Sequence, residues 1–183
     1  MITRPSPALW QTYPPHENNG YLPNLHKQAI TDLSFSPSDP SLLYTVSADG
    51  NLLLTSLTSG EKLGRIPAHY GPVNGLSVSN ATASGKDLVL TGGDDGVARV
   101  WDPIALVEDG RKEPVVELDD GTGGCVTAVE WGKDGAVCFV GGIDNEIKVS
   151  VEAGRVSCRV ELGRERPSGL IVLRLAARYR SGI

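Results

Sequence analysis

The chain has 183 residues, of which 40% are hydrophobic and 21% are charged, and its formal net charge is −5 at pH 7. This length and balance suit a soluble globular domain with a core of its own. The apolar runs fall far short of the ~18–20 residues that span a bilayer, and no secretory signal opens the chain, so we expect a nuclear or cytoplasmic protein without a membrane helix.

Turns are expected to be frequent, because the chain holds 22 glycines and 12 prolines. Both residue types interrupt long helices and favour short strands joined by turns. The three cysteines, Cys125, Cys138 and Cys158, have neither the even number of a disulfide framework nor the spacing of a zinc site. We therefore predict no metal and no cofactor.

Short runs with strand-like alternation follow one another along the chain. The first run, 29–37, is followed by 41–47, by a third strand after Asp49 and by a fourth candidate at 61–66. The same order returns with the runs 72–79, 87–93, a strand after Asp95, and 114–118. It begins a third time with 125–135, 136–142 and a strand after Asp144. Alternation over four to eight residues between turn signals predicts β-strands.

An internal repeat connects these runs. The segments YTVSADGNLLLTSL, LTGGDDGVARVWDP and FVGGIDNEIKVSVE align without gaps around Asp49, Asp95 and Asp144, which are 46 and 49 residues apart. A period near this length with four strands in each unit is typical of a β-propeller, in which one unit forms one blade. The sequence therefore predicts an all-β fold built from blades.

The stretch GGDDGVARVWD, which ends in Trp101 and Asp102, resembles the WD40 family. The resemblance implies that a histidine, a serine or threonine, an aspartate and a tryptophan are hydrogen-bonded together in each well-specified blade. In the second unit these positions hold a full structural tetrad: His69, Thr91, Asp95 and Trp101. A catalytic triad is the alternative that the same residue types suggest. Their spacing is that of the blade, however, and a buried aspartate needs hydrogen-bond donors around it for structural reasons alone.

The tetrads of the other two units are degenerate. The first unit keeps His26, Thr45 and Asp49, but Thr55 and Ser56 stand where Trp-Asp would be. The third unit keeps only Asp144. Its other three positions hold Thr122, Val140 and Ser150.

The stretch GGIDNEIKV, at 141–149, resembles the WD-repeat subunits of the U5 small nuclear ribonucleoprotein. In those proteins a Trp-Asp pair follows, whereas Ser150 and Val151 follow here. The resemblance implies a ring of seven blades, which needs about 300 residues at ~40–45 residues per blade. We therefore predict a partial WD40 β-propeller of about three to four blades, from a truncated version of such a protein.

The predicted organisation has five parts. They are 1–25, the end of a preceding blade and a linker; 26–66, a blade with a degenerate Trp-Asp; 67–118, the best-specified blade; 119–151, a partial blade; and 152–183, an arginine-rich tail. Residues 151–183 hold seven arginines and no lysine. Translation through an unspliced intron or in a shifted frame would give this abrupt change in composition. An arginine-rich tail that binds RNA is the alternative. Within the segment, the run RVSCRVEL could still serve as a blade strand.

The resemblance implies a non-catalytic scaffold that assembles proteins, with RNA as a further contact, in pre-mRNA splicing in the nucleus. An adaptor in a chromatin or ubiquitin-ligase complex is the alternative, and a propeller enzyme with carboxyl groups at a central channel is a third hypothesis. The predicted partner contacts are Lys27, Gln28, Tyr70 and Asp94, on exposed turns. Solvated turn residues without a partner are the alternative at these positions. No membrane and no small-molecule substrate are expected.

Overall fold

The computed structural model of the chain describes residues 8–10, 18–80, 85–110, 112–119, 123–133, 135, 137–144, 147–151, 156–162 and 173–177. Nearly all regular elements in these ranges are strands, and every strand pair is antiparallel. The prediction of an all-β fold is confirmed.

Three sheets carry most of the described chain. Blade 1 is a four-stranded sheet of β3 (Ile30–Phe35), β4 (Leu42–Ser47), β5 (Asn51–Ser56) and β6 (Lys62–Pro67). Blade 2 is a four-stranded sheet of β7 (Val73–Ser79), β8 (Leu88–Gly93), β9 (Ala98–Trp101) and β10 (Val116–Leu118). In both blades the strands are hydrogen-bonded in chain order, as the repeat predicts.

Blade 3 is a five-stranded sheet. It contains β11 (Val126–Trp131), β12 (Val137–Gly142), β13 (Ile147–Val151), β14 (Val156–Leu162) and β15 (Leu173–Ala177). Its last two strands come from the arginine-rich segment, and β14 coincides with the run RVSCRVEL. Near the N-terminus, β1 (Ala8–Trp10) and β2 (Asn18–Tyr21) form a separate two-stranded sheet.

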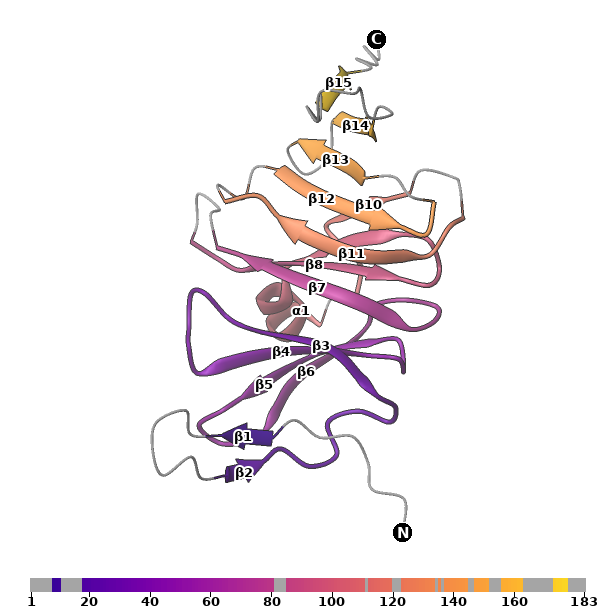
Figure 1. Ribbon diagram of the computed structural model, residues 1–183. Coiled ribbons are helices and arrows are strands. Elements are labelled where there is room, and N and C mark those ends of the chain that lie inside the picture. The colour runs from indigo at the N-terminus through magenta and orange to yellow at the C-terminus, as the bar shows by residue number, and fades with distance from the viewer. Residues whose placement is uncertain are drawn as a thin grey trace.

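The sheets lie above one another in chain order, from β1 and β2 at the bottom of Figure 1 to β15 at the top. The central strands of blades 1 and 2 are buried along nearly their whole length, whereas β3 alternates between half-buried and exposed residues. A strand covered on both faces needs a nearly continuous apolar run, which the sequence supplies in LLYTVS and LVLTGG.

Apolar side chains fill the spaces between successive blades. One cluster joins blades 1 and 2 and includes Tyr44, Leu52, Val89 and Trp101. A second cluster joins blades 2 and 3 and includes Val100, Val129 and Trp131 among its members. Each blade therefore buries its faces against its neighbours, as expected for repeats that cannot bury an apolar face alone.

Polar contacts repeat at the same two interfaces. The Thr31 hydroxyl donates to the carbonyl of Val73, and the Asn74 side chain donates to the carbonyl of Val126 over 2.8 Å. Thr31 and Asn74 occupy equivalent positions on β3 and β7, and the two accepting carbonyls are equivalent as well. Each bond thus connects the first strand of one blade to the first strand of the next.

A short helix, α1 (Pro103–Asp109), follows β9 and was not predicted from the sequence. Its N-cap is Asp102, whose side chain accepts from the backbone N–H of Ala105 over 3.0 Å, and Pro103 stands at the start, where proline is favoured. The helix lies between blades 1 and 2 (Figure 1). Gly64 on β6 makes room for it, because a Cβ there would lie 2.6 Å from Cγ2 of Val107.

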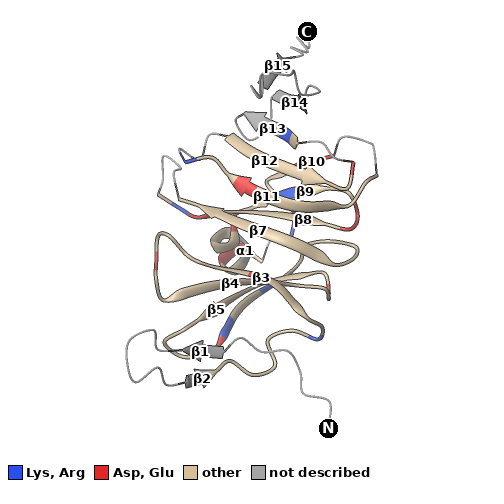
Figure 2. Cartoon of the chain, in the orientation of Figure 1, with Lys and Arg blue, Asp and Glu red and all other residues tan. Residues whose placement is uncertain are grey.

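Charged residues of the described chain lie in turns and also on strands such as β9 and β11, whereas β4, β5, β7, β8 and β12 carry none (Figure 2). Within the described ranges, no helix is long and apolar enough to cross a membrane.

Candidate functional site

The four tetrad residues of blade 2 come from four different places in the blade. His69 precedes β7, Thr91 lies on β8, Asp95 lies in the following turn and Trp101 ends β9. The structure brings them together: His69 Nδ1 is 2.7 Å from Asp95 Oδ1, and His69 Nε2 is 2.8 Å from the Thr91 hydroxyl. Trp101 Nε1 donates to the same hydroxyl over 2.9 Å.

The proton positions in this set follow from the acceptors. His69 Nδ1 faces Asp95 Oδ1, which can only accept, and Arg99 Nη1, which can only donate and lies 2.8 Å away. Because Arg99 Nη1 already donates to Asp95, we place the proton of His69 on Nδ1, where it is donated to the carboxylate. Nε2 then accepts from the Thr91 hydroxyl, which itself accepts from Trp101. Burial lowers the pKa of His69 against the opposing effect of Asp95, which agrees with a neutral imidazole.

Arg99 is a fifth member of this set that the sequence reasoning missed. Its Nη1 donates to Asp95 Oδ2 over 2.7 Å and to the Ala68 carbonyl over 3.2 Å, and its Nε donates to Glu117 Oε1 over 2.7 Å. Burial alone would raise the pKa of Asp95, but the hydrogen bonds from Arg99 and His69 outweigh it and lower that pKa to about 2. The sequence contained a signal for this role of Arg99. Arg99 lies two residues before Trp101, and residues two apart on a strand point to the same face of the sheet.

Blade 1 keeps three of the four tetrad residues and two of the three contacts between them. His26 Nδ1 lies 3.2 Å from Asp49 Oδ1, and His26 Nε2 lies 2.9 Å from the Thr45 hydroxyl. Thr55 occupies the tryptophan position, is fully buried, and has a hydroxyl without a hydrogen-bond partner in the described part of the chain. Burial alone would raise the pKa of Asp49, but hydrogen bonds from the Lys27 backbone, Asn51 and His26 lower it to about 2.

Blade 3 does not assemble a comparable set among its described residues. Asp144 Oδ2 pairs with Lys148 Nζ at 2.8 Å, and Val140 is buried between the blades. Thr122 and the side chain of Ser150 lie outside the described residues.

Asp95 is bonded to His69 and His69 to Thr91, which is the acid–imidazole–hydroxyl arrangement of a catalytic triad. The Thr91 hydroxyl is nevertheless not placed for attack on a substrate. Thr91 is fully buried, and Trp101 already donates to its oxygen. A substrate would have to displace a tryptophan from the core to reach it. This trio is therefore not arranged for nucleophilic chemistry.

Lys27 and Tyr70 occupy equivalent positions, each directly after the histidine of its blade. The Lys27 N–H donates to Asp49 Oδ2 over 2.8 Å, and the Tyr70 N–H donates to Asp95 Oδ2 over 3.2 Å. The backbone is thus held by a buried carboxylate while the side chain points outward, and Tyr70 is 98% exposed.

Gln28 and Asp94 complete the predicted contact residues, and both are exposed. Asp94 Oδ1 accepts from the side chain of Asn74 over 2.8 Å, and the Asp94 N–H donates to the Pro72 carbonyl over 2.9 Å. Lys27, Gln28, Tyr70 and Asp94 lie in turns at one edge of blades 1 and 2, the edge that carries the histidine–aspartate pairs. We call these four residues the rim.

The sequence of the first two blades matches a known repeat. Residues 22–56 and 60–102 fit the family described as WD domain, G-beta repeat. The chain contains WD40 repeats. Together with the stacked four-stranded sheets, this match confirms the predicted partial WD40 β-propeller.

Three similar WD40-repeat chains illustrate the range of relatives. Pre-mRNA-splicing factor cwf17 of Schizosaccharomyces pombe is 34% identical over 146 residues, which cover 77% of this chain and 38% of the relative. Pre-mRNA-processing factor 19 of Bos taurus is 28% identical over 125 residues, or 68% of this chain and 23% of the relative. WD repeat-containing protein 37 of Homo sapiens is 33% identical over 76 residues, or 42% of this chain and 15% of the relative. The chain thus spans well under half the length of these relatives.

We expect the free energy of unfolding of this WD40 chain to fall in two steps as the pH is lowered. Burial lowers the pKa of His26 and His69 from 6.5, so the unfolded chain takes up these protons first and stability is lost as the pH falls below about 6.5. The pKa of Asp49 and Asp95 is lowered from 3.8 to about 2, so their contribution is complete above pH 4 and is lost as the pH falls towards 2. Urea denaturation followed by tryptophan fluorescence between pH 2 and pH 8 measures both steps.

The Asp95→Ala variant assigns the acid step to the tetrad. It leaves His69, Arg99 and the Tyr70 N–H without their common acceptor, so we expect it to cost about 1–3 kcal/mol at pH 7 and to weaken the step between pH 4 and pH 2. Asp94→Ala removes the neighbouring exposed carboxylate and is the matched control, with a cost within about 0.5 kcal/mol. An Asp95→Ala variant with the wild-type stability and acid profile would contradict the structural role of the tetrad.

Proposed function

We propose that this WD40 chain is a non-catalytic scaffold of the pre-mRNA splicing machinery that binds protein partners through its rim. The observation that carries the proposal is the similarity to Pre-mRNA-splicing factor cwf17, which extends over 77% of the chain. The similarity to Pre-mRNA-processing factor 19 supports the same process. A scaffold in this process acts in the nucleus.

The geometry of the rim supports a binding role. An exposed aromatic side chain on a fixed backbone buries a large area in an interface at a small cost in conformational entropy. Tyr70 has these properties, because its backbone is bonded to Asp95 and its ring is exposed. Lys27 is held in the same way on the neighbouring blade and adds a positive charge that can select partners.

Within splicing, we propose that the chain belongs to the U5 small nuclear ribonucleoprotein. The stretch GGIDNEIKV supports this assignment, since it is the part of the sequence that resembles U5 WD-repeat subunits rather than WD40 repeats in general. Its neighbours there would be large proteins together with the U5 RNA. The arginine-rich segment, which lies mainly outside the described residues, is the candidate for a contact with RNA.

Affinity purification of the tagged full chain from its own cells, followed by mass spectrometry and RNA sequencing, tests the proposal. We expect U5 RNA and splicing proteins to be recovered with the wild-type chain. A rim variant carrying Lys27→Glu and Tyr70→Ser should recover about tenfold less of them, as expected for the loss of an interface anchor. Lys133→Glu, a charge reversal at an exposed turn of blade 3, should not change the recovery.

Other results would contradict specific parts of the proposal. Recovery of chromatin or ubiquitin-ligase proteins in place of splicing proteins would overturn the splicing assignment and favour a general WD40 adaptor. Equal recovery of splicing proteins by the wild type and the rim variant would keep the process but exclude the rim as the binding surface.

A further inference from the structure

The turn between β8 and β9 holds Asp94, an exposed residue. The Asp94 N–H donates to the Pro72 carbonyl over 2.9 Å, and the side chain of Asn74 donates to Asp94 Oδ1 over 2.8 Å. From the connection that leads into blade 3, the Cys125 thiol donates to the Asp94 carbonyl over 3.7 Å. The position of this carboxylate is therefore fixed by contacts within blade 2 and with blade 3.

Two large apolar side chains adjoin Asp94, one from each of these blades. Tyr70 of blade 2 is followed by Gly71, where a Cβ would lie 3.5 Å from the Asp94 Cβ. Ile143 lies in the turn between β12 and β13 of blade 3, and its N–H donates to the carbonyl of Cys125 over 3.2 Å. Because Cys125 also contacts Asp94, a chain of contacts connects the three residues across the two blades. We call Tyr70, Asp94 and Ile143 the patch.

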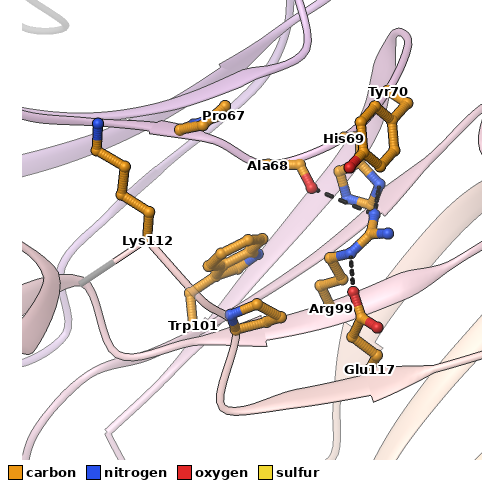
Figure 3. Close-up of a pocket in the computed structure, with 9 residues that line it drawn as sticks. Pro67, Ala68, His69, Tyr70, Arg99, Trp101, Lys112 and Glu117 are labelled. Atoms are coloured by element: carbon orange, nitrogen blue, oxygen red, sulfur yellow. Dashed lines mark hydrogen bonds and ion pairs between the residues drawn. The ribbon is translucent and has the colours of Figure 1, made fainter.

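Both apolar side chains of the patch are exposed on a fixed backbone. Tyr70 is 98% exposed while its N–H donates to Asp95, and it lies beside His69 (Figure 3). Ile143 is 64% exposed. In blade 3 the position equivalent to Tyr70 is Gly123, so no further side chain stands there. Exposed apolar groups on an ordered backbone lose little conformational entropy when a partner covers them.

The carboxylate of the patch pairs with no cation in the part of the chain that the structure describes. None of the ion pairs there includes Asp94. Arg99, on the neighbouring β9, is paired with Glu117 over 2.7 Å (Figure 3). Lys148, on β13, is paired with Asp144 over 2.8 Å. These two cations already have carboxylate partners, so the charge of Asp94 is available to a cationic group of another molecule.

We propose that the patch binds an arginine of a partner protein that stands next to a large apolar residue in a linear segment. The guanidinium pairs with the Asp94 carboxylate and stacks on the ring of Tyr70, and the apolar residue packs against Ile143. A planar guanidinium forms both contacts at once, whereas the compact ammonium of lysine stacks less well. The exposed ring beside an unpaired carboxylate identifies the ligand as cationic, and Ile143 identifies its neighbour as apolar.

A basic protein segment suits this surface better than a nucleic acid does. Residues 151–183 hold seven arginines and three glutamates, so the negative net charge of the chain belongs to residues 1–150, which carry the patch. A phosphate backbone is repelled by such a surface, whereas a basic segment is attracted to it. This inference rests on the proposed binding role of the rim, adds Ile143 of blade 3 to that surface and names the ligand that it takes.

The test uses the purified full chain and an array of glycine-flanked peptides in which arginine adjoins leucine, isoleucine or phenylalanine. The best binder is labelled with fluorescein and measured by fluorescence anisotropy. We expect binding to weaken about tenfold in Asp94→Asn and in Ile143→Ser, and to be unchanged in Glu113→Gln. Asp94→Asn keeps an oxygen for the bond from Asn74. Glu113 is an exposed carboxylate in the connection between α1 and β10, so its variant is the matched control.

The peptide is varied as well. Replacing its arginine with glutamine should abolish binding, and replacing it with lysine should weaken binding, because lysine keeps the charge but not the planar group. Thermal melting checks that the protein variants are folded, as expected for changes of exposed side chains.

Equal binding by the wild type and by either Asp94→Asn or Ile143→Ser, or no binding by any arginine peptide, would overturn the proposed site. Tighter binding of acidic peptides, or of a single-stranded RNA of similar length, would overturn its ligand chemistry. Neither result decides the splicing proposal, which depends on proteins recovered from cells. Conversely, failure to recover splicing proteins would overturn that process and leave the peptide measurement valid, since it uses only the purified chain.

Discussion

Replacing Trp101 with alanine lowers the free energy of unfolding of the chain by about 3–5 kcal/mol, as expected for loss of a large buried aromatic side chain. Trp101 is 1% exposed and belongs to the apolar cluster between blades 1 and 2. The change leaves a cavity at that interface and removes the donor to the Thr91 hydroxyl. Urea denaturation at pH 7, followed by circular dichroism, measures the loss.

The Trp101→Phe variant separates packing from hydrogen bonding. It keeps most of the apolar area but has no N–H for Thr91, so we expect it to cost about 1–3 kcal/mol and less than the alanine variant. If the phenylalanine variant were as unstable as the alanine variant, the indole hydrogen bond and not the packing would dominate. A stable alanine variant would show that the two blades do not depend on this side chain.

Replacing Asp87 with alanine is expected to cost about 2–4 kcal/mol, because it leaves several buried donors of the neighbouring blade without an acceptor. Asp87 lies just before β8 of blade 2 and is fully buried. It accepts from the Tyr44 hydroxyl over 2.9 Å, from the Ser38 N–H over 3.2 Å and from the Ser36 hydroxyl, all in blade 1. Chemical denaturation of Asp87→Ala beside Asp87→Asn, which keeps one acceptor oxygen, measures the effect.

A double-mutant cycle with Tyr44→Phe isolates one of these bonds. Burial raises the pKa of Tyr44 and Asp87 raises it further, so this hydroxyl keeps its proton at neutral pH and donates it to Asp87. We expect a coupling free energy of about 0.5–3 kcal/mol between the two positions. Additive effects would indicate that the contact between Tyr44 and Asp87 does not stabilise the interface.

The blade architecture was predictable because it depends on local patterns that repeat. The runs around Asp49 and Asp95 place an aspartate turn between two apolar strands, and this order alone implies β4 with β5 and β8 with β9. The tetrad residues of blade 2 were predicted from the resemblance of GGDDGVARVWD to the WD40 family, which assigns a role to each position. The structure joins His69, Thr91, Asp95 and Trp101 in one set of hydrogen bonds.

The contacts that were not predicted join residues that do not recur at equivalent positions of the repeat. Asp87 meets Tyr44, Ser36 and Ser38 across 43 to 51 positions of the chain, and nothing in the repeat pairs these residues. Helix α1 was missed for a different reason, because only seven residues form it and the apolar pattern of such a short segment is ambiguous. Its capping pair, Asp102 and Pro103, was the available signal, but the same aspartate belongs to the Trp-Asp signature.

The side chains that connect the first strands of successive blades form hydrogen bonds with backbone atoms. Thr31 and Asn74 each donate to a carbonyl, and Asp32 and Ser77 each accept from an N–H, of Leu76 and Trp131 respectively. Every residue type other than proline offers the same carbonyl and N–H, so the accepting or donating blade can change its side chains without losing the contact. Substitutions are therefore tolerated at the residues that contribute only backbone atoms to these contacts. Successive repeats can diverge in sequence at these positions while the blades still stack in the same order.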